Sequence, residues 1–216
     1  MKINEIFLSI QGEGVQMGIP TTFVRTTGCN LSCGWCDTVY ARDPEAGDEM
    51  TVDQIVAKVK KNHVKHVCLT GGEPLMQSES LSLVKALIGE GFLVSIETNG
   101  SLPIDDYLEL DPAKVVVSLD VKCPSSGMTE HNLIESLGKL RPTDQLKFVI
   151  RDAKDIRYAK KVLEANPVGC QIVFQPVHGT DPKWLAERVL KSGLKALGVR
   201  VMVQLQKVIW GKKRGV

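Results

Sequence analysis

Short runs of apolar residues alternate with amphipathic segments along most of this chain. Runs rich in Val, Ile and Phe are typical of half-buried strands. They predict strands at residues 3–10, 22–26, 66–70, 93–98, 114–119, 145–150, 171–175 and 200–205. Between the strands, apolar residues recur at intervals of three and four, which is typical of helices with one buried face. This spacing predicts helices at residues 51–61, 78–88, 132–140, 155–165 and 182–191.

The alternation of strands and helices predicts an α/β fold with parallel strands and right-handed crossovers. About six such units follow residue 36, and 216 residues fall short of the ~250 of a full eightfold barrel. We therefore predict a single domain, residues 1–216, built as a partial TIM-like α/β barrel with about six parallel strands. An open doubly wound sheet is the alternative, because periodicity does not distinguish the two. Residues 41–49 are acidic and turn-rich, which predicts a surface loop.

Composition narrows the class of protein. Hydrophobic residues make up 43% of the chain and charged residues 24%, which is ordinary for a soluble globular protein. The formal net charge of +2 is too small to indicate direct binding of nucleic acid or of an acidic membrane surface. No apolar run is long enough to span a bilayer, and the N-terminus lacks the features of a signal peptide. We expect a cytoplasmic protein.

Three of the six cysteines are crowded into the spacing C-x3-C-x2-C, at Cys29, Cys33 and Cys36. Clustering of this kind indicates a metal site rather than a disulfide framework. Three thiolates are one fewer than a 4Fe-4S cluster usually has, so one iron would stay open to a chelating small molecule such as S-adenosylmethionine (SAM). The alternative is a zinc site completed by Cys123, Cys68 or a histidine. Cys68 lies within a predicted strand and Cys170 directly before another, and we expect both at core positions.

Further motifs follow the cysteines in a recognisable order. Trp35 precedes the last cysteine, Thr70-Gly71-Gly72-Glu73-Pro74 ends one predicted strand, and Glu97-Thr98-Asn99-Gly100 ends the next. Each motif alone is weak, since such residues are common in turns. Together they resemble the radical SAM superfamily, and this resemblance implies a radical SAM core that holds a 4Fe-4S cluster and SAM.

Other segments narrow the resemblance to one family of that superfamily. Ile10-Gln11-Gly12-Glu13-Gly14, Phe23-Val24-Arg25, Cys36-Asp37-Thr38 and the stretch from Asp120 to Gly127 resemble the 7-carboxy-7-deazaguanine synthases. The resemblance implies a SAM- and Mg²⁺-dependent lyase of deazapurine (queuosine or archaeosine) biosynthesis. Its reaction would be the radical ring contraction of 6-carboxy-5,6,7,8-tetrahydropterin to 7-carboxy-7-deazaguanine, with release of ammonia. It also implies a homodimer and a flavodoxin- or ferredoxin-type reductant.

The resemblance implies a role for individual residues. The cluster would be held by Cys29, Cys33 and Cys36, and Mg²⁺ by Thr38. SAM would be contacted by Trp35, Cys36, Asp37, Gly72, Asp120, Val121, Lys122, Gln175, Pro176, Val177 and His178. The substrate would be contacted by Ile10, Gln11, Gly12, Arg25 and Thr70. Two positions depart from the family pattern: Asp120, where many relatives carry Ser, and Gln206, where many carry His. Residues 210–216 either cover the pterin site or are disordered.

Two other functions are consistent with parts of the pattern. A glycyl-radical-enzyme activase would share the cysteine spacing and the small partial barrel, but it lacks the I-Q-G-E-G and P-S-S-G segments. A non-catalytic zinc-binding module would use the thiols structurally. Iron and acid-labile sulfide in anaerobically purified protein would distinguish a cluster from zinc.

Overall fold

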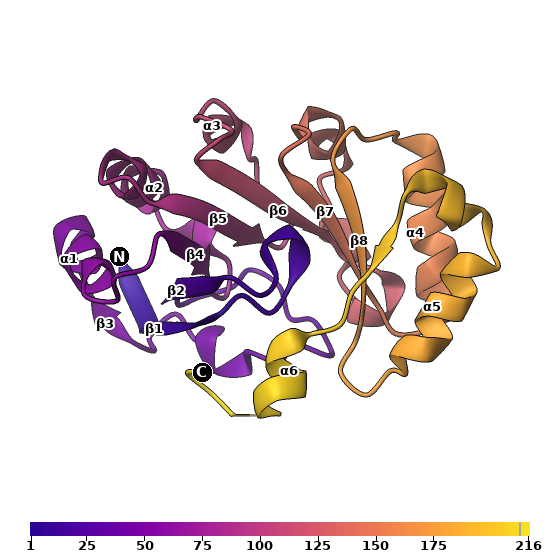
Figure 1. Cartoon of the computed structure of the whole chain (residues 1–216), viewed down its shortest axis with the longest axis horizontal. Coiled ribbons are helices and arrows are strands. Elements are labelled where there is room, and N and C mark those ends of the chain that lie inside the picture. Colours follow the sequence, from indigo (N-terminus) through magenta and orange to yellow (C-terminus); the bar gives the residue numbers. More distant parts are fainter. Residues whose placement is uncertain (212) are drawn as a thin grey trace.

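The strands form one curved sheet whose outer face carries the main helices (Figure 1). The structure is a computed structural model, and it describes residues 1–211 and 213–216. Its nine strands are β1 Lys2–Ile10, β2 Pro20–Thr26, β3 Asp48–Glu49, β4 His66–Thr70, β5 Leu93–Thr98, β6 Val115–Val121, β7 Gln145–Ile150, β8 Gln171–Pro176 and β9 Arg200–Val201.

The order of the strands decides between the two architectures that the sequence allowed. The sheet runs β3-β1-β2-β4-β5-β6-β7-β8-β9. Every neighbouring pair from β2 to β9 is parallel, and β1 pairs antiparallel with both β2 and β3. A doubly wound sheet reverses its strand order at a switch point, whereas the parallel strands here, β2 and β4 to β9, follow one another in sequence order without a reversal. The partial barrel is confirmed, and β4 to β9 are the six strands predicted after the cysteines.

The helices begin where the sequence offers side-chain caps. Thr51 and Gln54 form a reciprocal capping box at the start of α1, Val52–Lys60, and Asp152 caps α4, Ala153–Ala165. Asp181 caps α5, Pro182–Leu190. These side chains satisfy amide groups that would otherwise lack partners. The remaining α-helices are α2 Ser80–Gly89, α3 Asp105–Leu108 and α6 Leu205–Trp210.

The two faces of each parallel strand have different surroundings. The outward side chains, such as Leu69, Ile96, Leu119 and Phe148, belong to the apolar core beneath the helices. The alternate, inward side chains are mostly polar, because neighbouring residues of a strand point to opposite faces. They include Thr70, Glu97, Ser118, Asp120, Lys147 and Gln175. The interior of the half-barrel is therefore a polar, concave surface.

Three predicted elements are wrong in detail. The strand predicted at 200–205 is only Arg200–Val201, and Leu205 instead begins helix α6. The helix predicted at 132–140 is a 3-10 helix, Ile134–Lys139. Within the predicted surface loop 41–49, Ala41 is buried and Asp48–Glu49 pairs with the start of β1, because that edge strand has unpaired backbone groups to offer. Across the described residues, each helix is too short or too polar to cross a bilayer.

Candidate active site

A cavity of about 330 Å³ opens at the carboxyl ends of the parallel strands. Its walls are the inward residues of β4 to β8, the loop that carries the three clustered cysteines, the hairpin of β1 and β2, and the C-terminal segment. A cavity of this size and position is typical of a small-molecule site in an α/β fold.

The three clustered cysteines all line this one cavity. Each of their thiols is free and partly exposed. Burial raises the pKa of the Cys29 and Cys33 thiols. In the described residues, no three His, Cys, Asp or Glu side chains are grouped as a single metal ion would require. Three thiols around one cavity are a donor set that fits an iron–sulfur cluster, in which each thiol binds a different iron.

The other cysteines lie apart from this loop. Cys123 and Cys170 belong to the apolar core, as expected for Cys170. Cys68 is fully buried, as predicted for a core position, and its side chain also lines the cavity. Burial raises its pKa to about 12, so this thiol is protonated at neutral pH.

The P-S-S-G segment, residues 124–127, is hydrogen-bonded to the cysteine loop. The Trp35 indole N–H donates to the Ser125 hydroxyl over 3.0 Å, and Gly34 N–H donates to the Ser126 carbonyl over 3.0 Å. Ser125 in turn donates from its hydroxyl (2.6 Å) and its amide (2.9 Å) to the fully buried carboxylate of Asp155, on α4. No motif in the sequence indicated a role for Asp155.

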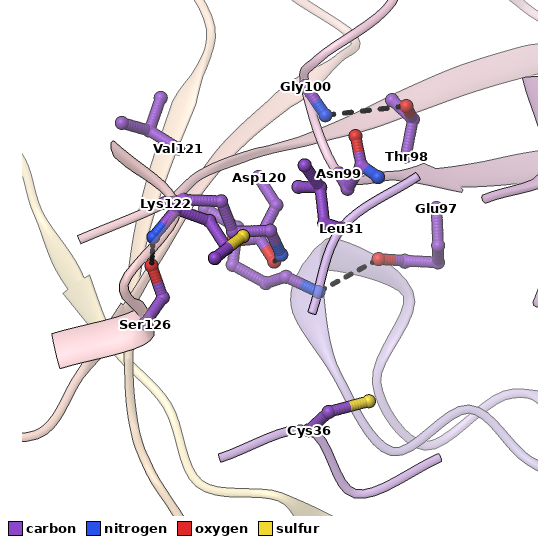
Figure 2. Close-up of polar contacts among 12 residues, drawn as sticks. Leu31, Cys36, Glu97, Thr98, Asn99, Gly100, Asp120, Val121, Lys122 and Ser126 are labelled. Atoms are coloured by element: carbon purple, nitrogen blue, oxygen red, sulfur yellow. Dashed lines mark hydrogen bonds and ion pairs between the residues drawn. The ribbon is translucent and has the colours of Figure 1, made fainter. Parts of the chain in front are cut away.

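The Glu73 carboxylate holds the end of β5 against the cysteine loop. Glu73 is fully buried and accepts hydrogen bonds from the Thr98 hydroxyl (2.9 Å) and from the Asn99 amide (2.6 Å). The Asn99 side-chain amide then donates to Cys29 Sγ over 3.7 Å and to Asn30 Oδ1 over 3.0 Å. Burial raises the pKa of Glu73. Figure 2 shows the same turn, with the Gly100 amide donating to the Thr98 hydroxyl.

Gly72 lies against the cysteine loop more closely than any other residue type allows. A Cβ at this position would collide with the Gly28 carbonyl oxygen and would come within 2.9 Å of the Cys29 Cβ. The glycine is therefore required by close packing against the loop rather than by its own backbone angles.

Asp120 and Lys122 form a buried ion pair at the end of β6. Lys122 Nζ lies 2.7 Å from Asp120 Oδ2, and also 5.7 Å from the centre of the Trp35 ring. Burial alone would lower the pKa of Lys122, but the Asp120 carboxylate raises it. The second oxygen, Asp120 Oδ1, is buried and has no partner among the described residues. Between the two, Val121 points away from the cavity into the core (Figure 2).

An ionic network absent from the sequence predictions joins three strands and the β1–β2 hairpin. Lys147 Nζ lies 2.9 Å from Glu97 Oε2 and 3.2 Å from Glu13 Oε2. Ser118 donates to Glu97 over 2.9 Å. Burial alone would raise the pKa of Glu13, but the Lys147 charge and glutamine donors lower it to about 2. Burial alone would lower the pKa of Lys147, but the carboxylates of Glu97 and Glu13 raise it well above its usual value.

A second charged group surrounds Arg25. Its Nε donates to Glu5 over 2.7 Å, and its guanidinium lies 6.0 Å from the Phe7 ring centre and 5.9 Å from that of Tyr40. Phe7 itself stacks on Phe23 with the ring centres 5.0 Å apart. This end of the cavity combines aromatic faces with a fixed positive charge.

Most of the other predicted site residues also line the cavity. They are Ile10, Gln11, Gly12, Asp37, Thr38, Thr70, Gln175, Val177 and His178. Val121 and Pro176 are not among the lining side chains, because their strand positions point toward the core. Thr38 precedes a 3-10 helix, Val39–Ala41, but makes no side-chain cap, and its hydroxyl lies 3.7 Å from Cys36 Sγ. The Gln175 Oε1 atom is buried without a partner among the described residues.

The C-terminal segment lies across the mouth of the cavity, beside the N-terminal strands (Figure 1). The side-chain amides of Gln204 and Gln206 each donate to Glu13 Oε1 over 2.9 Å. Lys207 Nζ lies 3.2 Å from the Asp37 carboxylate, beside the cysteines. The sequence left two alternatives for the tail, a cover for the site or disorder. The described residues 213–216 line the cavity, which favours the first alternative. Lys212 lies outside the described residues.

Comparison with known proteins places the chain among relatives of one kind. The Radical SAM superfamily model matches residues 23–169. A protein of Methanospirillum hungatei named 7-carboxy-7-deazaguanine synthase is 44% identical over 97% of this chain and 85% of its own length. A Thermoplasma acidophilum protein of the same name is 40% identical over the full length of both. The crystal structure of QueE from Escherichia coli matches in fold, with a TM-score of 0.75 and 23% identity over 94% of this chain and 93% of that one.

Proposed function

This chain belongs to the 7-carboxy-7-deazaguanine synthase family of radical SAM enzymes, and we propose that it makes that product from 6-carboxy-5,6,7,8-tetrahydropterin, with release of ammonia. The observation that carries the proposal is one cavity that brings the three clustered thiols together with two separate charged groups. The first of these groups is Glu13, Lys147 and Glu97, and the second centres on Arg25.

The thiols of Cys29, Cys33 and Cys36 would hold the 4Fe-4S cluster, and the donor set fits because three thiols leave one iron open. When bound there, the cluster and SAM would together supply one-electron reductive chemistry to the cavity. The task of the protein is then to hold the partners in place and to exclude water.

SAM would lie between the cysteine loop and the ends of β6 and β8. Asp120 and Gln175 each direct a buried, unpartnered oxygen atom in this region, and unsatisfied acceptors of this kind are suited to a ligand with N–H or O–H groups. The positive charge of Lys122 lies beside Asp120 and the ring of Trp35. We assign SAM contacts to Trp35, Cys36, Asp37, Gly72, Asp120, Val121, Lys122, Gln175, Pro176, Val177 and His178, with Val121 and Pro176 acting through backbone atoms.

The substrate would use the two charged groups at different ends of its ring system. A reduced pterin has N–H donors and a carbonyl oxygen, which match the carboxylate of Glu97 and the ammonium of Lys147. Its carboxylate matches the guanidinium of Arg25, which can bind it through two parallel N–H groups. Ile10, Gln11, Gly12 and Thr70 line the intervening wall.

Magnesium would bind near Thr38. The hydroxyl of this residue faces the cavity beside Cys36 and caps no helix. Mg²⁺ prefers oxygen ligands and retains several waters, so a single protein hydroxyl is enough when the substrate carboxylate supplies another oxygen.

The proposal is tested by anaerobic purification followed by assay. The protein is expected to contain iron and acid-labile sulfide and, once reduced, to convert the carboxytetrahydropterin to the deazaguanine in the presence of SAM and Mg²⁺. Mass spectrometry identifies the product, and an ammonia assay measures the leaving group. Loaded enzyme that forms no deazaguanine would remove the substrate assignment and leave membership of the superfamily intact.

We also propose a flavodoxin- or ferredoxin-type electron donor, a homodimer and a cytoplasmic location. Reduction by each purified donor, sedimentation velocity and cell fractionation test these in turn. A glycyl-radical activase is disfavoured, because such an enzyme needs an open face for a protein substrate, whereas the C-terminal segment here lies over the cavity.

A further inference from the structure

The C-terminal segment brings a second guanidinium to the charged group around Arg25. Arg214 Nε lies 3.1 Å from Glu5 Oε2, while Arg25 Nε lies 2.7 Å from the other oxygen of the same carboxylate. The Arg214 guanidinium also lies 3.7 Å from the centre of the Tyr40 ring, whose hydroxyl donates to Glu5 over 2.9 Å. Two arginines are thus fixed around one glutamate and one aromatic ring, although 189 residues separate them in the sequence numbering (25 and 214).

The charges of this group do not balance. Glu5 is the single carboxylate shared by both guanidinium groups. Burial alone would raise the pKa of Glu5, but Arg25, Tyr40 and Arg214 lower it, so the carboxylate stays ionised. One positive charge is left over among Arg25, Arg214 and Glu5, and Lys213 also lines the cavity, as does Lys207, which is paired with Asp37. An excess of fixed positive charge beside a cavity attracts an anionic ligand.

Both arginines keep hydrogen-bond donors for such a ligand. In the described residues, the hydrogen bonds of Arg25 use Nε alone, and those of Arg214 use Nε with Glu5 and Nη2 with Asn4. Guanidinium carries five N–H donors in a fixed plane, and stacking on Tyr40 restricts the orientation of that plane. Arg25 is nearly buried, with 13% of its side chain exposed, whereas Arg214 is 52% exposed. Arg25 is therefore a fixed part of the cavity wall, and Arg214 is the guanidinium that the C-terminal segment contributes.

We propose that Arg214 is a substrate-specificity residue that binds the carboxylate of the pterin together with Arg25, so that the C-terminal segment closes over carboxylated ligands in particular. This inference rests on the proposed function, since it assigns one end of the same ligand. Arg214 acts as a binding residue, and the radical chemistry does not pass through it.

The test compares two ligands that differ only in the carboxylate. The SAM-loaded holoenzyme is titrated anaerobically with 6-carboxypterin and with pterin, and ligand fluorescence gives each dissociation constant. Wild-type protein is expected to prefer 6-carboxypterin. In Arg214→Gln the preference is expected to fall about 10- to 100-fold, the range for loss of a charged, bidentate pair, while pterin binding is unchanged. Arg214→Lys should recover part of the preference through its charge.

A matched control is Arg157→Gln, which removes an exposed guanidinium from α4, away from the cavity. It should keep the full preference, and circular dichroism should show all variants folded. If Arg214→Gln weakens both ligands equally, the arginine merely anchors the segment and the proposal is overturned; an unchanged preference overturns it as well. A wild-type protein without any preference would instead contradict the proposed substrate itself.

Discussion

The indole N–H of Trp35 donates to the hydroxyl of Ser125 over 3.0 Å, although the two residues are 90 positions apart in sequence. This bond joins the cysteine loop to the P-S-S-G segment, and Ser125 continues it to the buried carboxylate of Asp155. The loop has no regular secondary structure around its cysteines. Its shape therefore depends on hydrogen bonds of this kind to other segments. The cysteine loop and the P-S-S-G segment, which are far apart in the sequence, therefore meet at one point of the structure.

Removal of the Asp155 carboxylate should loosen this brace. Asp155→Ala leaves the amides of Ser125 and Arg151 and the Ser125 hydroxyl without their buried acceptor. We expect a loss of about 2–4 kcal/mol of unfolding free energy, the range for stranded buried donors of a charged hydrogen bond. Urea unfolding measures it. Asp152→Ala, which removes only the exposed cap of the same helix, should cost about 1 kcal/mol; equal losses would show that the brace adds nothing beyond the helix cap.

Loss of one clustered thiol should abolish cluster binding. Cys33→Ala leaves two of the three clustered thiols, too few to hold a 4Fe-4S cluster, and bound iron should fall to less than about a tenth of the wild-type content. Colorimetric iron and sulfide assays on anaerobic protein measure this. Cys170→Ala, a change in the core away from the cavity, serves as the control and should retain its iron; full iron in Cys33→Ala would argue against the assignment of the ligands.

A methyl group at Gly72 should displace the cysteine loop. In Gly72→Ala the new Cβ would collide with the Gly28 carbonyl and press on Cys29. The Cys29 thiol would therefore shift relative to the other two clustered thiols. We expect iron incorporation to fall at least about tenfold while the chain stays folded. The matched control is Gly138→Ala, where a Cβ meets nothing within 4 Å. Normal iron content in Gly72→Ala would contradict the close packing that this geometry shows.

Because of the Glu13 carboxylate, the free energy of unfolding should depend on pH below neutrality. Its pKa is about 2 in the folded protein against an ordinary value of 4.5, so the ionised form stabilises the fold. That stabilisation is complete above about pH 4.5, and it is lost as the pH falls toward 2. A shift of this size corresponds to roughly 3 kcal/mol.

Urea unfolding of wild type and of Glu13→Gln at several pH values checks this prediction. The wild type should be more stable at pH 6, and the difference should shrink as the pH falls from about 4.5 toward 2. A difference that is constant over this range would show that the carboxylate of Glu13 is not held ionised by Lys147.

The hydroxyl of Thr38 should matter for magnesium and not for the fold. Thr38→Ala is expected to raise the Mg²⁺ concentration for half-maximal activity about tenfold, because a hard cation loses one oxygen ligand. Thr38→Ser keeps the hydroxyl and should behave like the wild type. An unchanged Mg²⁺ dependence in Thr38→Ala would remove the metal assignment and leave the cluster assignments untouched.

The sequence by itself determined the class of fold, the cysteine loop and the family. The apolar strands and the capped helices are local patterns, and the cysteines and the glycine-rich turns lie close together along the chain. Errors occurred where tertiary packing decides the outcome. Leu205 begins a helix rather than continuing a strand, because β9 pairs with β8 over two residues only.

Only the tertiary structure decided which charges meet. Glu13 and Glu97 were visible within their motifs, but Lys147 carried no signal, and the three join because neighbouring strands bring their inward side chains to one surface. Arg214 reaches Arg25 by a different route, because the C-terminal segment returns to the first strands. Local sequence fixes the direction of a side chain on its own strand, whereas the partner across the sheet follows from strand order and register.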